Sequence, residues 1–96
     1  MAFRESYDFD SLVNEAERLV TEELEAQLAR TTGICQCQDC VLDMAAFALN
    51  NVKPSYRVSL MGSVYAKSGA KTAYTQEISR AVHDAIAKIS ANPSHD

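Results

Sequence analysis

Apolar residues at helical spacing predict a first helix from about Ser11 to Arg30. Asp8 or Asp10 is placed to cap its start, and Gly33 closes it. The polar side of this stretch is rich in carboxylates, with Arg18 spaced to pair with Glu15 and Glu22. We interpret that side as a solvated face. Its glutamates are Glu15, Glu17, Glu22, Glu23 and Glu25. The apolar positions are Leu12, Val13, Ala16, Leu19, Val20, Leu24 and Leu28.

A second apolar stretch, from Val41 to Val52, predicts a helix capped by Asp39 and ending before Lys53-Pro54. This stretch is apolar nearly all round. A helix of that kind is expected at the centre of a fold, covered on several sides.

The chain between the second and third helices has a weaker pattern. Tyr56, Val58 and Leu60 alternate with polar residues, and residues 64–66 follow Gly62, which predicts one or two short extended pieces. Glycines at 62 and 69 disfavour a helix across this part of the chain.

A third helix is predicted from near Thr72 or Thr75 to Asn92-Pro93. Its apolar residues include positions 78, 82, 85 and 89, whose alternating steps of four and three are typical of a helix-packing seam. The partner in that seam is the first helix, the second helix or a second copy of the chain. We therefore expect a mainly α fold, a small bundle of three to four helices held by zinc and dimeric, with the loop or extended segment between helices 2 and 3.

Length and charge limit the classes of protein that fit. The 96 residues make a single domain, 1–96, with a core over about 11–95. No apolar run is long enough to cross a bilayer, and the N-terminus lacks the apolar core of a signal peptide, so we expect a cytoplasmic protein with reduced thiols. The net charge of −4 argues against broad nucleic-acid binding but leaves room for a small basic pocket.

The three cysteines of the chain, Cys35, Cys37 and Cys40, fall within six residues. A Cys-x-Cys pair forms a disulfide only with strain, whereas three thiols this close can converge on one Zn²⁺. Cys40 also falls in the first turn of the predicted second helix, where the helix dipole stabilises a thiolate. The alternative is a set of partly buried small side chains or a redox-reactive cluster. We favour structural zinc in a closed site that activates no water.

Zinc needs a fourth ligand. If the three helices run up, down and up, the end of the third returns to the cysteine loop and brings His95 near the thiols. His95 is therefore our predicted ligand. The alternatives are Asp39, Asp43, His83, a water molecule or a residue of a second chain.

No familiar catalytic motif is present: the sequence has no Gly-x-Ser-x-Gly, no phosphate-binding glycine loop and no His-Glu-x-x-His. We therefore expect a binding protein and not an enzyme. Its candidate ligand residues lie between helices 2 and 3, where tyrosines could stack on bases and cations could hold phosphates. They are Tyr56, Arg57, Tyr65, Lys67 and Lys71. The alternative is that the tyrosines pack the bundle and the cations keep it soluble.

Three segments together resemble the late competence protein ComFB family over roughly residues 12–95: "CQCQDCVLDMAAFALNNVKPSYRVS", "GSVYA" and "EISRAVHDAIAKISANPSH". The family pattern combines the cysteine knuckle with an Asp, a Leu-Asn near a helix end and Pro-x-Tyr. The matching positions are Cys35, Cys37, Cys40, Asp43, Ala46, Leu49, Asn50, Pro54 and Tyr56. The resemblance implies a small helical dimer with zinc on the three cysteines.

Some members of that family are receptors for cyclic dinucleotides, which by analogy implies binding of cyclic di-GMP or cyclic di-AMP here. The assignment of Arg57, Tyr65 and Lys67 to such a ligand rests on their chemistry, because a twofold ligand suits a twofold dimer that offers an arginine from each side. Two hypotheses follow. The chain is a nucleotide sensor that switches a protein partner, or a zinc-stapled interaction adaptor without a small ligand, using the acidic face of helix 1 or the dimer groove.

Overall fold

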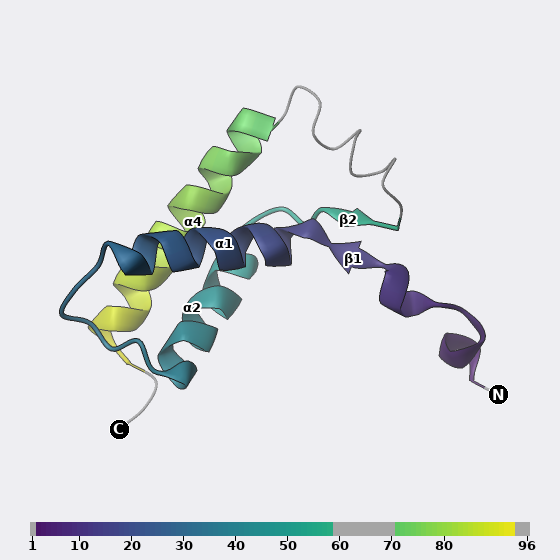
Figure 1. Cartoon of the computed structure of the whole chain (residues 1–96), viewed down its shortest axis with the longest axis horizontal. Coiled ribbons are helices and arrows are strands. Elements are labelled where there is room, and N and C mark those ends of the chain that lie inside the picture. The colour runs from purple at the N-terminus through teal and green to yellow at the C-terminus, as the bar shows by residue number, and fades with distance from the viewer. Residues whose placement is uncertain (1, 59–70, 94–96) are drawn as a thin grey trace.

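The computed structural model describes residues 2–58 and 71–93, and within them the fold is mainly helical (Figure 1). Its α-helices are α1 (Glu15–Ala29), α2 (Gln38–Leu49) and α4 (Lys71–Ala91). Two 3₁₀ turns, η1 (Phe3–Ser6) and η2 (Phe9–Ser11), precede a short strand β1 (Val13–Asn14), and β2 (Tyr56–Arg57) follows α2. The expected helical bundle is confirmed for these residues.

The first helix begins later than predicted. Asn14 is its cap and accepts a hydrogen bond from the Ala16 N–H at 3.1 Å, while Asp8 precedes only the turn η2. The same Asn14 oxygen accepts the Ser55 N–H at 2.8 Å. Val13 and Asn14 are therefore drawn into pairing with β2, a long-range contact that local helical spacing cannot reveal, and Ser11 remains in η2.

β1 and β2 form an antiparallel ribbon in which Val13 pairs with Arg57 and Asn14 with Tyr56. This confirms an extended piece at Tyr56. The rest of the predicted extended region, including Leu60 and residues 64–66, lies outside the described residues.

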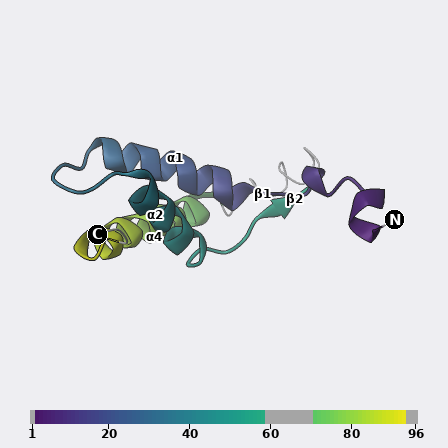
Figure 2. The ribbon, with the colours of Figure 1, turned by 90° about the horizontal axis from the view of Figure 1, so that it is seen from below.

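The second helix is not covered on several sides, contrary to our expectation. Cys40, Met44 and Ala48 form one buried stripe, whereas Leu42 is 58% exposed. Its cap residue is Cys37 and not Asp39, which lies exposed in the first turn. The physical reason is that, among the described elements, α2 packs against the helices α1 and α4, which cover one side of it (Figure 2).

The predicted seam of α4 is confirmed. Ile78, Val82 and Ala85 are buried, and Ile89 packs against the same core, which also contains residues of α1 and α2. α1 and α2 both contact α4, so a second copy is not needed to fill this seam. Outside the core, Tyr74 donates to the Lys53 carbonyl at 2.6 Å and Glu77 accepts the Lys53 N–H at 2.7 Å. These bonds fasten the chain after α2 to α4.

Within residues 2–58 and 71–93, no helix combines the length and apolar character needed to cross a membrane.

Candidate metal centre and the Glu15 network

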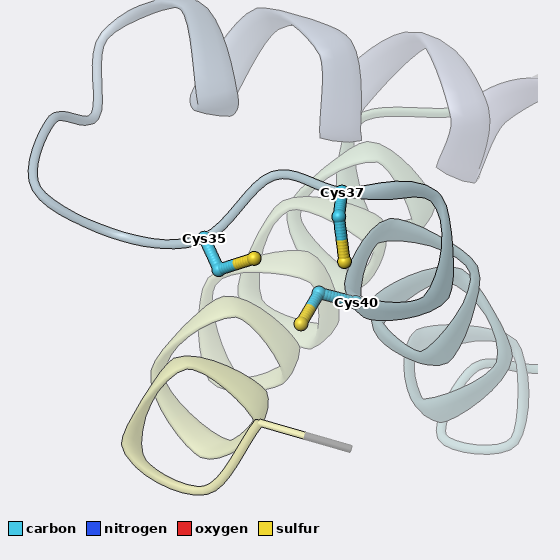
Figure 3. Close-up of side chains that lie close together, drawn as sticks. All are labelled: Cys35, Cys37 and Cys40. Atoms are coloured by element: carbon cyan, nitrogen blue, oxygen red, sulfur yellow. The ribbon is translucent and has the colours of Figure 1, made fainter. Parts of the chain in front are cut away.

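The three cysteines converge at the turn into α2 (Figure 3). Their sulfur atoms all lie within 4.8 Å of one another, and no disulfide joins them. Cys40 is buried, Cys35 is half-buried and Cys37 is exposed. The sequence prediction that these residues form one cluster is therefore confirmed.

Local backbone structure produces this convergence. α1 ends at Ala29, and Gly33 takes a φ of +80°, a left-handed conformation that glycine adopts without strain. The chain then turns back, so that Cys35 approaches the start of α2. Cys37 is the cap residue of α2, but its side chain makes no capping hydrogen bond. Cys40 lies one turn further on, as the third residue of the helix, and faces the core.

The electrostatics of the cluster favour thiolate formation at its half-buried member. The pKa of the Cys35 thiol is lowered from its ordinary value of 9.0, chiefly by a hydrogen bond with the Cys37 backbone and then by one with the Cys37 side chain. Burial opposes this shift. The N-terminal end of α2 adds a positive dipole at Cys37 and Cys40.

The three residues fit a zinc ion. Thiolate sulfurs bound to zinc at about 2.3 Å in a tetrahedron stand roughly 3.8 Å apart. Sulfurs already within 4.8 Å need only small side-chain rotations to reach that spacing. Three thiolates are also a donor set that zinc prefers.

A fourth ligand is not found among the described residues. Asp39, Asp43 and His83 are not part of the cluster, which consists there of the three cysteines. His95, the predicted ligand, lies outside the described residues, as do Tyr65 and Lys67. The helix order on which the His95 prediction depended is observed, since the C-terminal turns of α4 lie beside the cysteines (Figure 3).

Three other predicted site residues lie in the described part of the chain. Tyr56 and Arg57 form β2, and Lys71 is the first residue of α4. Tyr56 is 63% exposed. Arg57 is held by Glu15, with an Nη2–Oε1 distance of 3.0 Å, and its side chain is 25% exposed. Its Nε atom is buried and has no hydrogen-bond partner among the described residues.

Arg57, Glu15, Arg18 and Glu22 form a chain of ion pairs, which we call the Glu15 network. Sequence reasoning did not assign Glu15 or Arg18 to a site. Glu15 accepts a hydrogen bond from Arg18 on one carboxylate oxygen and from Arg57 on the other, both at 3.0 Å. Arg18 also pairs with Glu22 at 3.0 Å. The Arg18 spacing was visible in the sequence, but the bond between Glu15 and Arg57 spans 42 residues and had no local signal.

The Arg18 hydrogen bond is the main cause of a lowered pKa at Glu15, whose ordinary value is 4.5. Burial opposes the shift, and Arg57 adds to it. Glu15 is therefore ionised at neutral pH and orients two guanidinium groups, a role that a solvated glutamate does not have.

Fold and site together define a small helical protein with a three-cysteine candidate metal centre. The sequence profile of the family described as "Late competence development protein ComFB" matches residues 13–93. The chain therefore belongs to the ComFB family.

A solved structure supports this assignment. It is described as the late competence protein ComFB from Bacillus subtilis, and it superimposes with a TM-score of 0.70 at 28% sequence identity. The alignment covers 86% of this chain and 92% of that one. Among curated proteins, a sequence search finds no significant match.

Proposed function

We propose that this protein is a zinc-stabilised, non-enzymatic regulator that binds a cyclic dinucleotide, cyclic di-GMP or cyclic di-AMP, and signals through a protein partner. The observation that carries the ligand proposal is the presence on β2 of an exposed aromatic ring and of an arginine fixed in orientation. Tyr56 offers a face for base stacking on one side of the ribbon, and Glu15 holds Arg57, the next residue, on the other. Tyr65 and Lys67 belong to the same proposal by their chemistry.

Zinc has a structural role in this proposal. Cys35, Cys37 and Cys40 hold the ion, with His95 as the fourth ligand. The ion then ties the loop after α1 to the start of α2, and four protein ligands leave no position for a reacting water.

A homodimer completes the proposed receptor. A cyclic dinucleotide is twofold symmetric and carries two negative charges. A dimer with a twofold axis offers it two equivalent copies of Tyr56 and Arg57.

The nucleotide proposal is tested by thermal unfolding of metal-loaded protein with cyclic di-GMP and cyclic di-AMP, using linear pGpG and GTP as controls. A ligand at a hundredfold its Kd stabilises the folded state by about 2.7 kcal/mol, which raises Tm by roughly 10 °C or more in a domain of this size. We expect one cyclic dinucleotide to do so selectively.

Variants make this test specific. Tyr56→Ala should remove most of the nucleotide-dependent rise, because it removes the stacking face from an exposed position. Tyr7→Ala is its matched control, since Tyr7 is 61% exposed and Tyr56 63%. Arg57→Ala should also abolish the nucleotide-dependent rise in Tm. Because this change breaks the ion pair with Glu15 and can lower Tm by itself, the Tm of the variant with nucleotide is compared with the Tm of the same variant without nucleotide. An unchanged Tm with every nucleotide would refute the sensor.

The second candidate is a zinc-stapled adaptor that binds proteins and no small ligand. Exposed apolar side chains support it, namely Leu42 on α2 and Val58 after β2, which are 58% and 66% exposed. This candidate would lead if folded, metal-loaded protein shows no nucleotide-dependent change in Tm.

The metal is tested separately by elemental analysis. We expect about one Zn²⁺ per chain, and a reduced content together with a lower Tm in Cys37→Ser. Gln38→Ser is the control, because residue 38 is the exposed neighbour of Cys37 and carries no metal donor of the same kind. A stable wild-type protein purified without metal would contradict the zinc proposal.

A further inference from the structure

An open polar groove of about 450 Å³ lies between α1 and α4, on residues separate from β2 and the cysteines. α1 contributes Gln27 and Arg30 to its lining. α4 contributes Ser79, Arg80, His83 and Asp84. The volume falls in the range of small-ligand sites, roughly 300–1,000 Å³.

Neither of the two arginines in this groove is in an ion pair among the described residues. Within residues 2–58 and 71–93, Arg18 and Arg57 are in ion pairs with glutamates, but Arg30 and Arg80 are in none. Both are exposed. The lining contains two guanidinium groups and one carboxylate, that of Asp84, so the groove is locally positive in a chain of net charge −4.

Of the carboxylates on this side of the two helices, Glu23 accepts a hydrogen bond from the Gln27 amide at 2.7 Å. Asp84 lines the groove itself, and its carboxylate lies 3.6 Å from Nδ1 of His83, which is longer than a hydrogen bond. The C-terminal end of α1 would repel an anion through its carbonyl groups, but two of these carbonyls accept hydrogen bonds from the chain. The Gln27 carbonyl accepts from the Arg30 N–H and the Thr31 hydroxyl, and the Leu28 carbonyl accepts from the Thr31 N–H.

The floor of the groove is also fixed in place. Gln27 is buried and donates to the Ser79 carbonyl at 3.0 Å, which locks α1 to α4 under the two arginines. This bond keeps the two helices, and with them the backbone positions of the two arginines, at a fixed separation, so binding a ligand would order only the arginine side chains.

We infer that this groove binds a small anion that carries phosphate groups, held by Arg30 from α1 and Arg80 from α4. Guanidinium groups bind phosphate oxygens in a bidentate manner, and arginines from two helices suit a ligand with two phosphate charges. The His83 imidazole lines the same groove and is the reporter of occupancy. The inference does not depend on the proposed nucleotide site, because none of the residues of that site lines the groove.

The test is an NMR titration of the full, metal-loaded chain with inorganic pyrophosphate at constant ionic strength. The chain has two histidines, so the imidazole signals of His83 are assigned with a His83→Gln variant. We expect a saturable shift of the His83 signals. Sodium sulfate is the control for general anion effects, and zinc content is measured before and after because pyrophosphate binds metals.

Arg30→Gln and Arg80→Gln should each weaken pyrophosphate binding by about tenfold, the effect of losing one charge-assisted hydrogen-bonding group. Both residues are exposed, so Tm should stay unchanged in each variant. Lys88→Gln is the matched control, since it removes one exposed positive charge from α4 outside the groove and should change the affinity by less than about twofold.

A parallel titration with cyclic di-GMP distinguishes the source of the phosphate. A His83 shift in both titrations identifies a nucleotide phosphate as a ligand of this groove, and a shift with pyrophosphate alone identifies a free phosphate compound. The inference is overturned if the His83 signals do not shift saturably with pyrophosphate, if sulfate produces the same shift, or if both arginine variants bind pyrophosphate as the wild type does.

Discussion

Glu15 is the residue that joins the start of α1 to the ribbon. Its side chain is 11% exposed and bridges Arg18 and Arg57. Because Arg57 is a proposed ligand residue, Glu15 is a positioning residue for it. At the same time its negative charge lowers the positive potential that a nucleotide phosphate would meet.

We predict that Glu15→Gln lowers the free energy of unfolding at pH 7 by about 1–2 kcal/mol, between the values for exposed and buried ion pairs. The folded-state pKa of Glu15 is lowered, so its contribution is complete above its ordinary value of 4.5 and is lost as the pH falls through the folded value. Urea unfolding of both proteins at a series of pH values should show the difference shrinking below pH 4.5.

Glu17→Gln is the control for this measurement, because Glu17 is exposed on the same helix and has no ion pair within the described part of the chain. Its unfolding free energy should differ little from that of the wild type at every pH. A Glu15→Gln protein as stable as Glu17→Gln at pH 7 would contradict a role for the network in stability.

At the scale of elements, α2 connects the candidate metal centre to the core. Its buried stripe begins with Cys40, continues with Met44 and ends with Ala48, so the same helix face carries a thiol of the candidate metal centre and the apolar contacts. A metal ion bound at Cys40 would therefore act on the helix that the core packs against.

We predict a large difference between two apolar residues of α2 that are two positions apart. Met44→Ala removes a fully buried side chain and should cost about 2–5 kcal/mol of unfolding free energy. Leu42→Ala, at a 58% exposed position, should cost less than about 0.5 kcal/mol. Chemical denaturation of metal-loaded protein measures both. Equal losses would mean that Leu42 is covered in solution, as the adaptor or dimer hypothesis would allow.

At the scale of the whole molecule, the chain is flat and extended. Its radius of gyration is 15.6 Å, where a compact domain of this length has about 12–13 Å. The N-terminal turns project away from the helices (Figures 1 and 2). Large exposed apolar residues gather at this end, on the N-terminal segment and the ribbon. They are Phe3, Tyr7, Leu12, Tyr56 and Val58.

This shape supports the proposed homodimer, because exposed apolar surface is covered when two copies associate. We predict a sedimentation-equilibrium mass of twice 10.5 kDa at micromolar concentration. A mass of one chain across the full concentration range would contradict the dimer and leave the twofold nucleotide site without a basis.

The sequence by itself determined the three helices, the seam of α4 and the clustering of the cysteines. These features depend on neighbours a few residues apart: helical spacing assigns Ile78 and Val82 to one face, and two short gaps keep Cys35, Cys37 and Cys40 together. The tertiary structure decided the start of α1, the exposed side of α2, the contacts of Glu15 and the groove that Arg30 shares with Arg80. Those features depend on contacts between segments that are tens of residues apart, such as the contact of Glu15 with Arg57 and the packing of α1 against α4. Local spacing carries no information about such long-range contacts.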